Sequence, residues 1–217
     1  MNSIRRVTED SLLYGYLVLG IFFILLPVVV LMAFSFNSAS FPRLPFKGFT
    51  LDWYQELFSN PDLTTALLRS VVLGVLAGLS STTLGFLAAF TLARYDVPFK
   101  TVFQLALTLP MTVSYTIIGL GLLIYFGMIG ISKSFFTVWI AHTTLFLPIP
   151  MAIIYSQLGR YQVNLERAAM DLGANTLKTM LYITMPLITP AILASFFLTF
   201  TLSWDEFIVA FFVSGFS

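Results

Sequence analysis

The chain has 217 residues, of which 58% are hydrophobic and only 10% are charged. Soluble domains carry about 25% charged residues, so this composition excludes an ordinary water-soluble protein and indicates an integral membrane protein. A formal net charge of +1 does not favour nucleic acid as a partner, and the absence of cysteine excludes a disulfide framework, a thiolate metal site and a thiol nucleophile.

Five segments are long and apolar enough to cross a bilayer. A hydrocarbon core of about 30 Å needs roughly 20 apolar residues in a helix, and a helix satisfies its backbone polar groups without water. The sequence therefore predicts an all-α integral membrane protein, a polytopic helical bundle formed by one transmembrane domain. Because five spans would leave the end of the chain outside, we expect a sixth span to follow. The expected spans are residues 12–36, 70–93, 101–128, 134–158 and 187–213.

Lysine and arginine residues predict the orientation of these spans. With the N-terminus in the cytoplasm, most basic residues lie in inner segments, as the positive-inside rule requires. This orientation places residues 37–65 outside and residues 159–186 in the cytoplasm. Arg69, at the outer end of the second span, is either an interfacial anchor or a residue of a transport pathway. The inner basic residues are Arg5, Arg6, Arg94, Lys100, Arg160, Arg167 and Lys178, and the outer ones are Arg43, Lys47 and Lys133.

The extracytoplasmic segment begins with a turn-rich stretch and continues into a short helix. Prolines and a glycine within residues 41–48 indicate an extended chain with turns. Thr50 or Asp52 can cap the helix that follows, which would place Trp53 and Phe58 at the membrane interface.

The loop between the fourth and fifth spans is a polar island in an otherwise apolar chain. Asn164 is a suitable N-cap for a helix that starts at Leu165, and Gly173 can adopt the left-handed conformation that ends a helix. Ala169 and Leu172 share one face of this helix with Leu165.

A second short helix is expected at about residues 176–183, just before Pro186. On its pattern alone, the loop is either an amphipathic connector lying on the membrane surface or a solvated shelf for a soluble partner.

The spacing in this loop resembles the cytoplasmic signature of the permease subunits of bacterial type I ABC importers. That signature reads Glu-Ala-Ala, three residues, Gly, nine residues, Ile, one residue, and Leu-Pro. Two positions differ, because Arg167 stands in place of the glutamate, with Glu166 one residue earlier, and a methionine replaces the leucine. The spacing is kept by Ala168, Ala169, Gly173, Ile183, Met185 and Pro186.

The resemblance implies that the loop forms coupling helices that dock into a cleft on a separate ATP-hydrolysing subunit. Movement of that cleft would drive alternating access of the spans, which requires different contacts in the two states. The chain contains no glycine-rich phosphate loop, so it would not hydrolyse ATP itself. The resemblance implies a subunit that is not an enzyme, with ATP and Mg²⁺ in the partner subunits. The residues implied in docking are Leu165, Glu166, Arg167, Ala168, Ala169, Asp171, Leu172 and Gly173.

The same resemblance implies the other partners and the location of the protein. A permease of this kind pairs with a homologous second permease, two ATP-binding subunits and an extracytoplasmic solute-binding protein. It is a multi-pass protein of the bacterial plasma (inner) membrane.

A finer resemblance covers three short stretches. Residues 203–215 are similar to the end of the fifth span in permeases for polyamines and in relatives for opines and phosphonates, and residues 35–37 and 49–54 resemble the same subgroup. The second permease of spermidine/putrescine importers is the most similar type. A polyamine is therefore the expected solute, with an aminophosphonate, an opine or another small solute as the alternative.

Candidate residues of the solute pathway are acidic or aromatic. Asp205 and Glu206 lie within the fifth span, where charged side chains usually face the bundle interior or a cavity. They either attract a cationic solute or are structural, paired with a partner subunit or placed at the aqueous mouth. Tyr115 and Trp139 either line the path by cation–π contact or serve as packing. His142, the only histidine, is interpreted as hydrogen-bonded packing rather than a proton relay or ligand.

Two other classes of protein fit the sequence less well. A membrane-embedded enzyme would need a cluster of nucleophile, base or metal ligands, and the acidic residues here are scattered. An ion-coupled secondary carrier commonly has repeats with broken helices and buried ionisable groups near mid-membrane, and such a carrier has no need of a docking loop.

Overall fold

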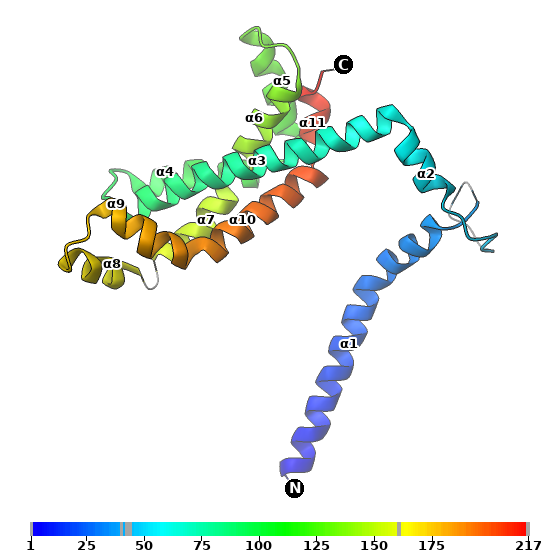
Figure 1. Ribbon diagram of the computed structural model, residues 1–217, viewed down its shortest axis with the longest axis horizontal. Helices are drawn as coiled ribbons and strands as arrows, with labels where there is room; N and C mark the ends of the chain where they lie inside the picture. Colours follow the sequence, from blue (N-terminus) through cyan, green and yellow to red (C-terminus); the bar gives the residue numbers. More distant parts are fainter. Residues whose placement is uncertain (1, 40, 42–44, 160–161, 216–217) are drawn as a thin grey trace. The chain divides into compact units, whose positions relative to one another are not determined.

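The computed structural model describes residues 2–39, 41, 45–159 and 162–215. The chain forms two compact units that divide between Ala66 and Leu67. Among the described residues, the regular structure is helical apart from one isolated antiparallel bridge (Figure 1). The expected all-α architecture is confirmed.

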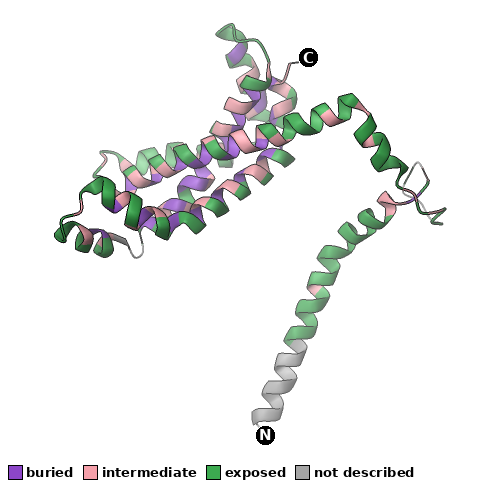
Figure 2. Cartoon of the chain, viewed as in Figure 1, coloured by how far each residue is buried: buried purple, intermediate pink, exposed green. Residues whose placement is uncertain are grey.

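The first unit contains α1 (Asn2–Ser35) and α2 (Asp52–Ser59). The large apolar side chains of α1 from Leu13 to Met32 are exposed (Figure 2). Because exposed apolar area costs roughly 25 cal/mol per Å² in water, this helix requires lipid or another protein around it.

The stretch just after α1 and the stretch just before α2 are held together by backbone and ring contacts. The bridge joins Asn37 to Phe49, and the rings of Phe36 and Phe49 stack with centroids 4.9 Å apart. The indole Nε1 of Trp53 donates to the carbonyl oxygen of Asn37 at 2.9 Å. The short stretches 35–37 and 49–54, which were noted separately in the sequence, therefore form one small structure.

In the second unit, the part of α3 (Pro61–Arg94) from Leu67 onward lies beside α7 (Pro148–Leu158) and α10 (Met185–Asp205) (Figure 1). Glycines of α3 make their close approach possible. A Cβ at Gly85 would lie 2.8 Å from the backbone nitrogen of Met151, and one at Gly78 would lie 3.0 Å from the ring of Phe196. The contact at Gly85 is with backbone, which cannot move aside as a side chain can, so this position requires glycine; close contacts at small residues are common between membrane helices.

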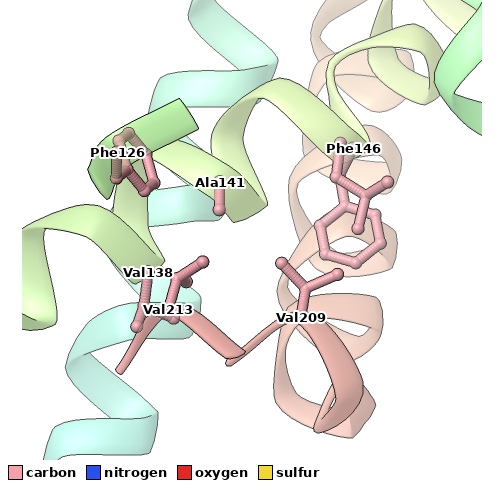
Figure 3. Packing of buried hydrophobic residues seen from close by; sticks show 7 residues of the cluster. Phe126, Val138, Ala141, Phe146, Val209 and Val213 are labelled. Atoms are coloured by element: carbon pink, nitrogen blue, oxygen red, sulfur yellow. The ribbon is translucent and has the colours of Figure 1, made fainter. Parts of the chain in front are cut away.

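A second group of helices forms the other core cluster of this unit. It consists of α5 (Tyr115–Met128), α6 (Phe135–Phe146) and α11 (Ile208–Val213). Figure 3 shows the buried side chains of this cluster, with Val209 and Val213 of α11 facing residues of α6 and α5. The short α11 is thus fixed by packing.

The expected third span differs from a single helix. It consists of α4 (Lys100–Thr108), the 3-10 helix η1 (Leu109–Thr112) and α5, and the direction of the chain changes by 104° at the break. Pro110 and the extended backbone of Val113 and Ser114 account for the break.

Four helices of the described chain are long and apolar enough to cross a membrane, and five segments are if the bent pair is counted as one span. The first and fourth expected spans agree with helices of the structure, and the second ends where expected but its helix begins earlier, at Pro61. The fifth starts earlier than expected, because the helix is continuous from Thr176 to Asp205. It also ends earlier, since a break separates it from α11.

Candidate functional site

The helix of the loop between the fourth and fifth spans, α8 (Gln162–Asp171), starts before the expected position. Asn164 lies inside this helix and is not its N-cap, so that prediction was wrong. An asparagine cap is worth only about 1 kcal/mol, which is too little to set the start of a helix against its tertiary contacts.

The end of α8 agrees with the sequence. Gly173 has a φ of +92°, and its N–H donates to the carbonyl of Met170 at 2.9 Å. The N–H of Ala174 donates to the carbonyl of Ala169 at 3.0 Å. This pair of bonds is the Schellman motif, so the predicted glycine stop is confirmed.

Most residues predicted to dock share an exposed surface. We call this surface the exposed face of α8; its leucines are notable because Leu172 is 90% exposed and Leu165 is 50% exposed. Ala169 is half-buried. The two leucines and Ala168 give this surface apolar area, and Arg167 and Asp171 add one charge of each sign. The exposed face of α8 consists of Leu165, Arg167, Ala168, Asp171, Leu172 and Gly173.

Glu166 is the exception among these residues, because its side chain is buried. Its two carboxylate oxygens accept hydrogen bonds from Arg94 Nε at 2.7 Å and Arg94 Nη2 at 2.8 Å. The hydroxyl of Thr184 donates to the same carboxylate at 2.7 Å. The negative charge of Glu166 thus lies on the buried side of α8, and all of these hydrogen-bond donors belong to the same chain.

Arg94 connects this carboxylate to two other helices. It is the last residue of α3, and its Nη1 donates to the carbonyl of Leu158, the last residue of α7, at 3.1 Å. Thr184 belongs to the π-helix η2 (Met180–Thr184). We call Arg94, Glu166 and Thr184 the inner link. Sequence reasoning used Arg94 only as the boundary of a span and as one of the inner basic residues, and it did not single out Thr184.

The second helix of the loop is not separate from the fifth span. It begins as α9 (Thr176–Thr179), where the side chain of Asn175 accepts from the N–H of Lys178 at 2.8 Å, and continues through η2 into α10. Residues 176–183 are therefore helical as expected, but the prediction that they form a separate short helix was wrong. Pro186 lacks an N–H and crowds the preceding turn, and the wider π turn absorbs that defect without ending the helix.

The two acidic residues at the C-terminal end of α10 lie in different environments. Asp205, the last residue of α10, is exposed, whereas Glu206 is buried. The Glu206 carboxylate accepts from the N–H of Val209 at 2.9 Å and of Ala210 at 3.3 Å. Glu206 thus accepts hydrogen bonds from backbone N–H groups at the start of α11 that have no partner within that helix. Of the two acidic side chains, only that of Asp205 is exposed and can meet a ligand.

His142 is fully buried beside Glu206. Its Nδ1 lies 2.8 Å from the hydroxyl of Ser203, its Nε2 lies 3.4 Å from a Glu206 oxygen, and its ring meets Phe146 edge to face. This agrees with the interpretation of His142 as hydrogen-bonded packing.

The two aromatic pathway candidates lie in different surroundings. Tyr115 meets Phe146 edge to face with centroids 6.5 Å apart. Trp139 donates to the hydroxyl of Ser80 at 3.1 Å and lines an open groove of about 700 Å³. Asp205 and Glu206 are not among the residues that line this groove. Whether any of these residues touches a solute stays a prediction.

The described chain thus combines several apolar helices with an exposed loop helix that a buried ion pair fixes to the ends of α3 and α7. Residues 81–216 match the family described as the binding-protein-dependent transport system inner membrane component. The chain belongs to this family, that of type I ABC importer permeases.

Three similar proteins share most of the length of the chain. The spermidine/putrescine transport system permease protein PotC of Haemophilus influenzae is 34% identical over 195 residues, covering 90% of this chain and 76% of the relative. PotC of Escherichia coli K12 is 33% identical over 193 residues, covering 89% and 73%. The putrescine transport system permease protein PotI of the same strain is 34% identical over 206 residues, covering 92% and 73%.

These comparisons confirm the resemblance noted in the signature loop and in the subgroup stretches. They identify the chain as a multi-pass inner-membrane permease whose relatives are transport proteins and not enzymes.

Proposed function

We propose that this chain is the permease subunit of an ATP-driven polyamine importer and works by alternating access. The observation that carries the proposal is the exposed face of α8 in a chain of this family. In the proposed orientation, the N-terminus and residues 159–186 are cytoplasmic and residues 37–65 lie outside.

The exposed face of α8 is suited to a cleft on an ATP-hydrolysing subunit. Leu172 and Leu165 are large apolar side chains in water, and covering them is favourable by roughly 25 cal/mol per Å². The Schellman turn at Gly173 gives the end of the helix a fixed shape. Docking would be carried by Leu165, Arg167, Ala168, Ala169, Asp171, Leu172 and Gly173, with Glu166 acting from beneath.

The complete importer requires other chains. The proposal includes a homologous second permease, a solute-binding protein at the outer face and two ATP-binding subunits, which hold ATP and Mg²⁺. The exposed apolar residues of α1 also require a neighbour, either lipid or a partner subunit.

A polyamine is favoured as the solute for two reasons. PotC and PotI are named for spermidine or putrescine transport, and Asp205 presents an exposed carboxylate at the end of α10. A carboxylate in a membrane pathway attracts cations. An aminophosphonate or an opine remains the alternative, because related permeases resemble one another at this end of the span.

A solute screen tests this proposal. The importer is reconstituted in liposomes with its binding protein, and ATP hydrolysis is measured with spermidine, putrescine and aminoethylphosphonate. We expect spermidine or putrescine to stimulate hydrolysis, because a loaded binding protein favours the state in which the ATP-binding subunits close.

The other outcomes of this screen are distinct. Stimulation by aminoethylphosphonate alone would replace the polyamine with the alternative solute. Solute uptake without any ATP hydrolysis would instead indicate an ion-coupled carrier and would contradict the proposed mechanism.

A further inference from the structure

We propose that the inner link, Arg94, Glu166 and Thr184, transmits movement of the docked loop to the second and fifth spans. In this view, Glu166 is a positioning residue that acts inside the permease and does not contact the ATP-binding subunit. The inference rests on the proposed docking of α8 and adds a route for the movement after docking.

The geometry of the ion pair supports a rigid connection. Arg94 Nε and Nη2 meet both oxygens of Glu166, at 2.7 and 2.8 Å. Two parallel bonds of this kind fix the orientation of the two side chains as well as their distance. The side chains of Arg94 and Glu166 are only 13% and 9% exposed, so solvent screens the pair less than it screens a surface pair.

The pair joins elements that are otherwise distant along the chain. α8 packs beside α9 and η2, whereas Arg94 reaches it from the end of α3. The same guanidinium binds the carbonyl of Leu158 at the end of α7, and Thr184 ties the carboxylate to the inner end of the fifth span. A displacement of α8 would therefore act on three helices of the bundle together.

α8 is joined to α9 and η2 by direct packing and to α3 by the inner link. A cavity of about 250 Å³ lies beside it, lined by Phe90, Tyr95, Met170 and Thr179 among others. Side-chain packing between the loop and α3 is therefore incomplete at this level. A buried ion pair is also a weak source of stability, because removing two charges from water costs several kcal/mol. This argues for a role in geometry rather than in stability alone.

The test uses a reporter for movement of the inner end of α3. Because the chain has no cysteine, a Thr91→Cys substitution introduces a single thiol at an exposed position of α3. In the purified complete importer, the rate of maleimide labelling is measured with and without Mg-ATP and vanadate, which trap the closed ATP-binding subunits. We expect trapping to change this rate.

Arg94→Gln and Glu166→Gln, each added to the reporter, should abolish the response to trapping while the ATP-binding subunits remain bound. The double variant should show no greater effect than either single one, because residues that act as one unit are not additive. Thr184→Val should reduce the response by removing one of the bonds to the carboxylate. Lys178→Gln, an exposed cation of the same loop, is the matched control and should leave the response unchanged.

Arg94→Lys distinguishes loss of the paired hydrogen bonds from a general loss of folding. It keeps a positive charge beside Glu166 but cannot form the paired bonds of a guanidinium, so it should reduce the response in a complex that assembles normally.

Three outcomes would overturn the inference. One is a normal response in the Glu166→Gln complex, and another is additive effects of Arg94→Gln and Glu166→Gln. The third is loss of the ATP-binding subunits from Glu166→Gln but not from Arg94→Gln, which would make Glu166 a direct contact. By contrast, failure of the parent chain to retain any ATP-binding subunit would refute the proposed docking itself.

Discussion

The backbone at Gly173 limits substitution more than the space around it does. A Cβ at this position would meet no atom within 4 Å, but its φ of +92° is a conformation that residues with side chains rarely adopt. The cost of a substitution here is therefore conformational, roughly 1–2 kcal/mol for an ordinary residue and more for a β-branched one.

This difference predicts the effects of two substitutions. Gly173→Val should distort the end of α8, reduce binding of the ATP-binding subunits and greatly reduce uptake, while the spans stay inserted. Gly173→Asn should retain most of both activities, because asparagine tolerates left-handed conformations. Co-purification of the ATP-binding subunits and solute uptake check both variants. Normal uptake by Gly173→Val would contradict a docking role for this turn.

The sequence predicted the functional residues where the signal is local. The left-handed glycine and the exposed leucines of the loop follow from residues a few positions apart, and both were found. The burial of Glu166 was missed, because its partner Arg94 lies 72 residues away in the chain. The separation of Asp205 from Glu206 was missed for another reason. It depends on a helix break two residues long, which no turn residue marks.

At the scale of helices, close approach depends on glycine. Gly85→Ala should destabilise the second unit, because its Cβ would lie 2.8 Å from the backbone nitrogen of Met151, and overpacking of this kind costs typically 1–3 kcal/mol. Gly121→Ala is the control, since its Cβ would meet nothing within 4 Å and alanine favours a helix. Thermal denaturation of the purified complex should show a lower midpoint for Gly85→Ala only. Equal midpoints would contradict the tight α3–α7 contact.

Helix boundaries were the less predictable part of the fold. Hydrophobic length located every apolar segment, but it did not reveal the 104° bend after η1 or the continuous helix from Thr176 to Asp205. Proline accounts for both cases in opposite ways. Pro110 is followed by extended residues and a break, whereas Pro186 lies in a helix that widens to a π turn and continues. The local sequence does not say which response occurs, because neighbouring helices satisfy the freed backbone groups.

At the scale of the whole molecule, the proposed orientation can be tested directly. Single cysteines are introduced by Phe58→Cys on α2 and by Lys178→Cys in the loop, both at exposed positions. An impermeant maleimide added to cells with a permeable outer envelope should label the first variant and not the second, and inside-out vesicles should give the reverse. The cysteine-free parent is the unlabelled control. Labelling of the Lys178→Cys variant from outside would refute the cytoplasmic assignment of the loop.

The unbroken helix from Thr176 to Asp205 has a consequence for distance. Its 30 residues correspond to roughly 45 Å at 1.5 Å per residue, more than the thickness of a hydrocarbon core. Thr184, whose hydroxyl binds Glu166, lies in the first third of this helix, and Asp205 is its last residue. A small rotation of this helix about its centre would move its two ends in opposite directions. A displacement of the loop on one side of the bilayer would then move the exposed Asp205 carboxylate on the opposite side. No chain of side-chain contacts between the two sites would be needed.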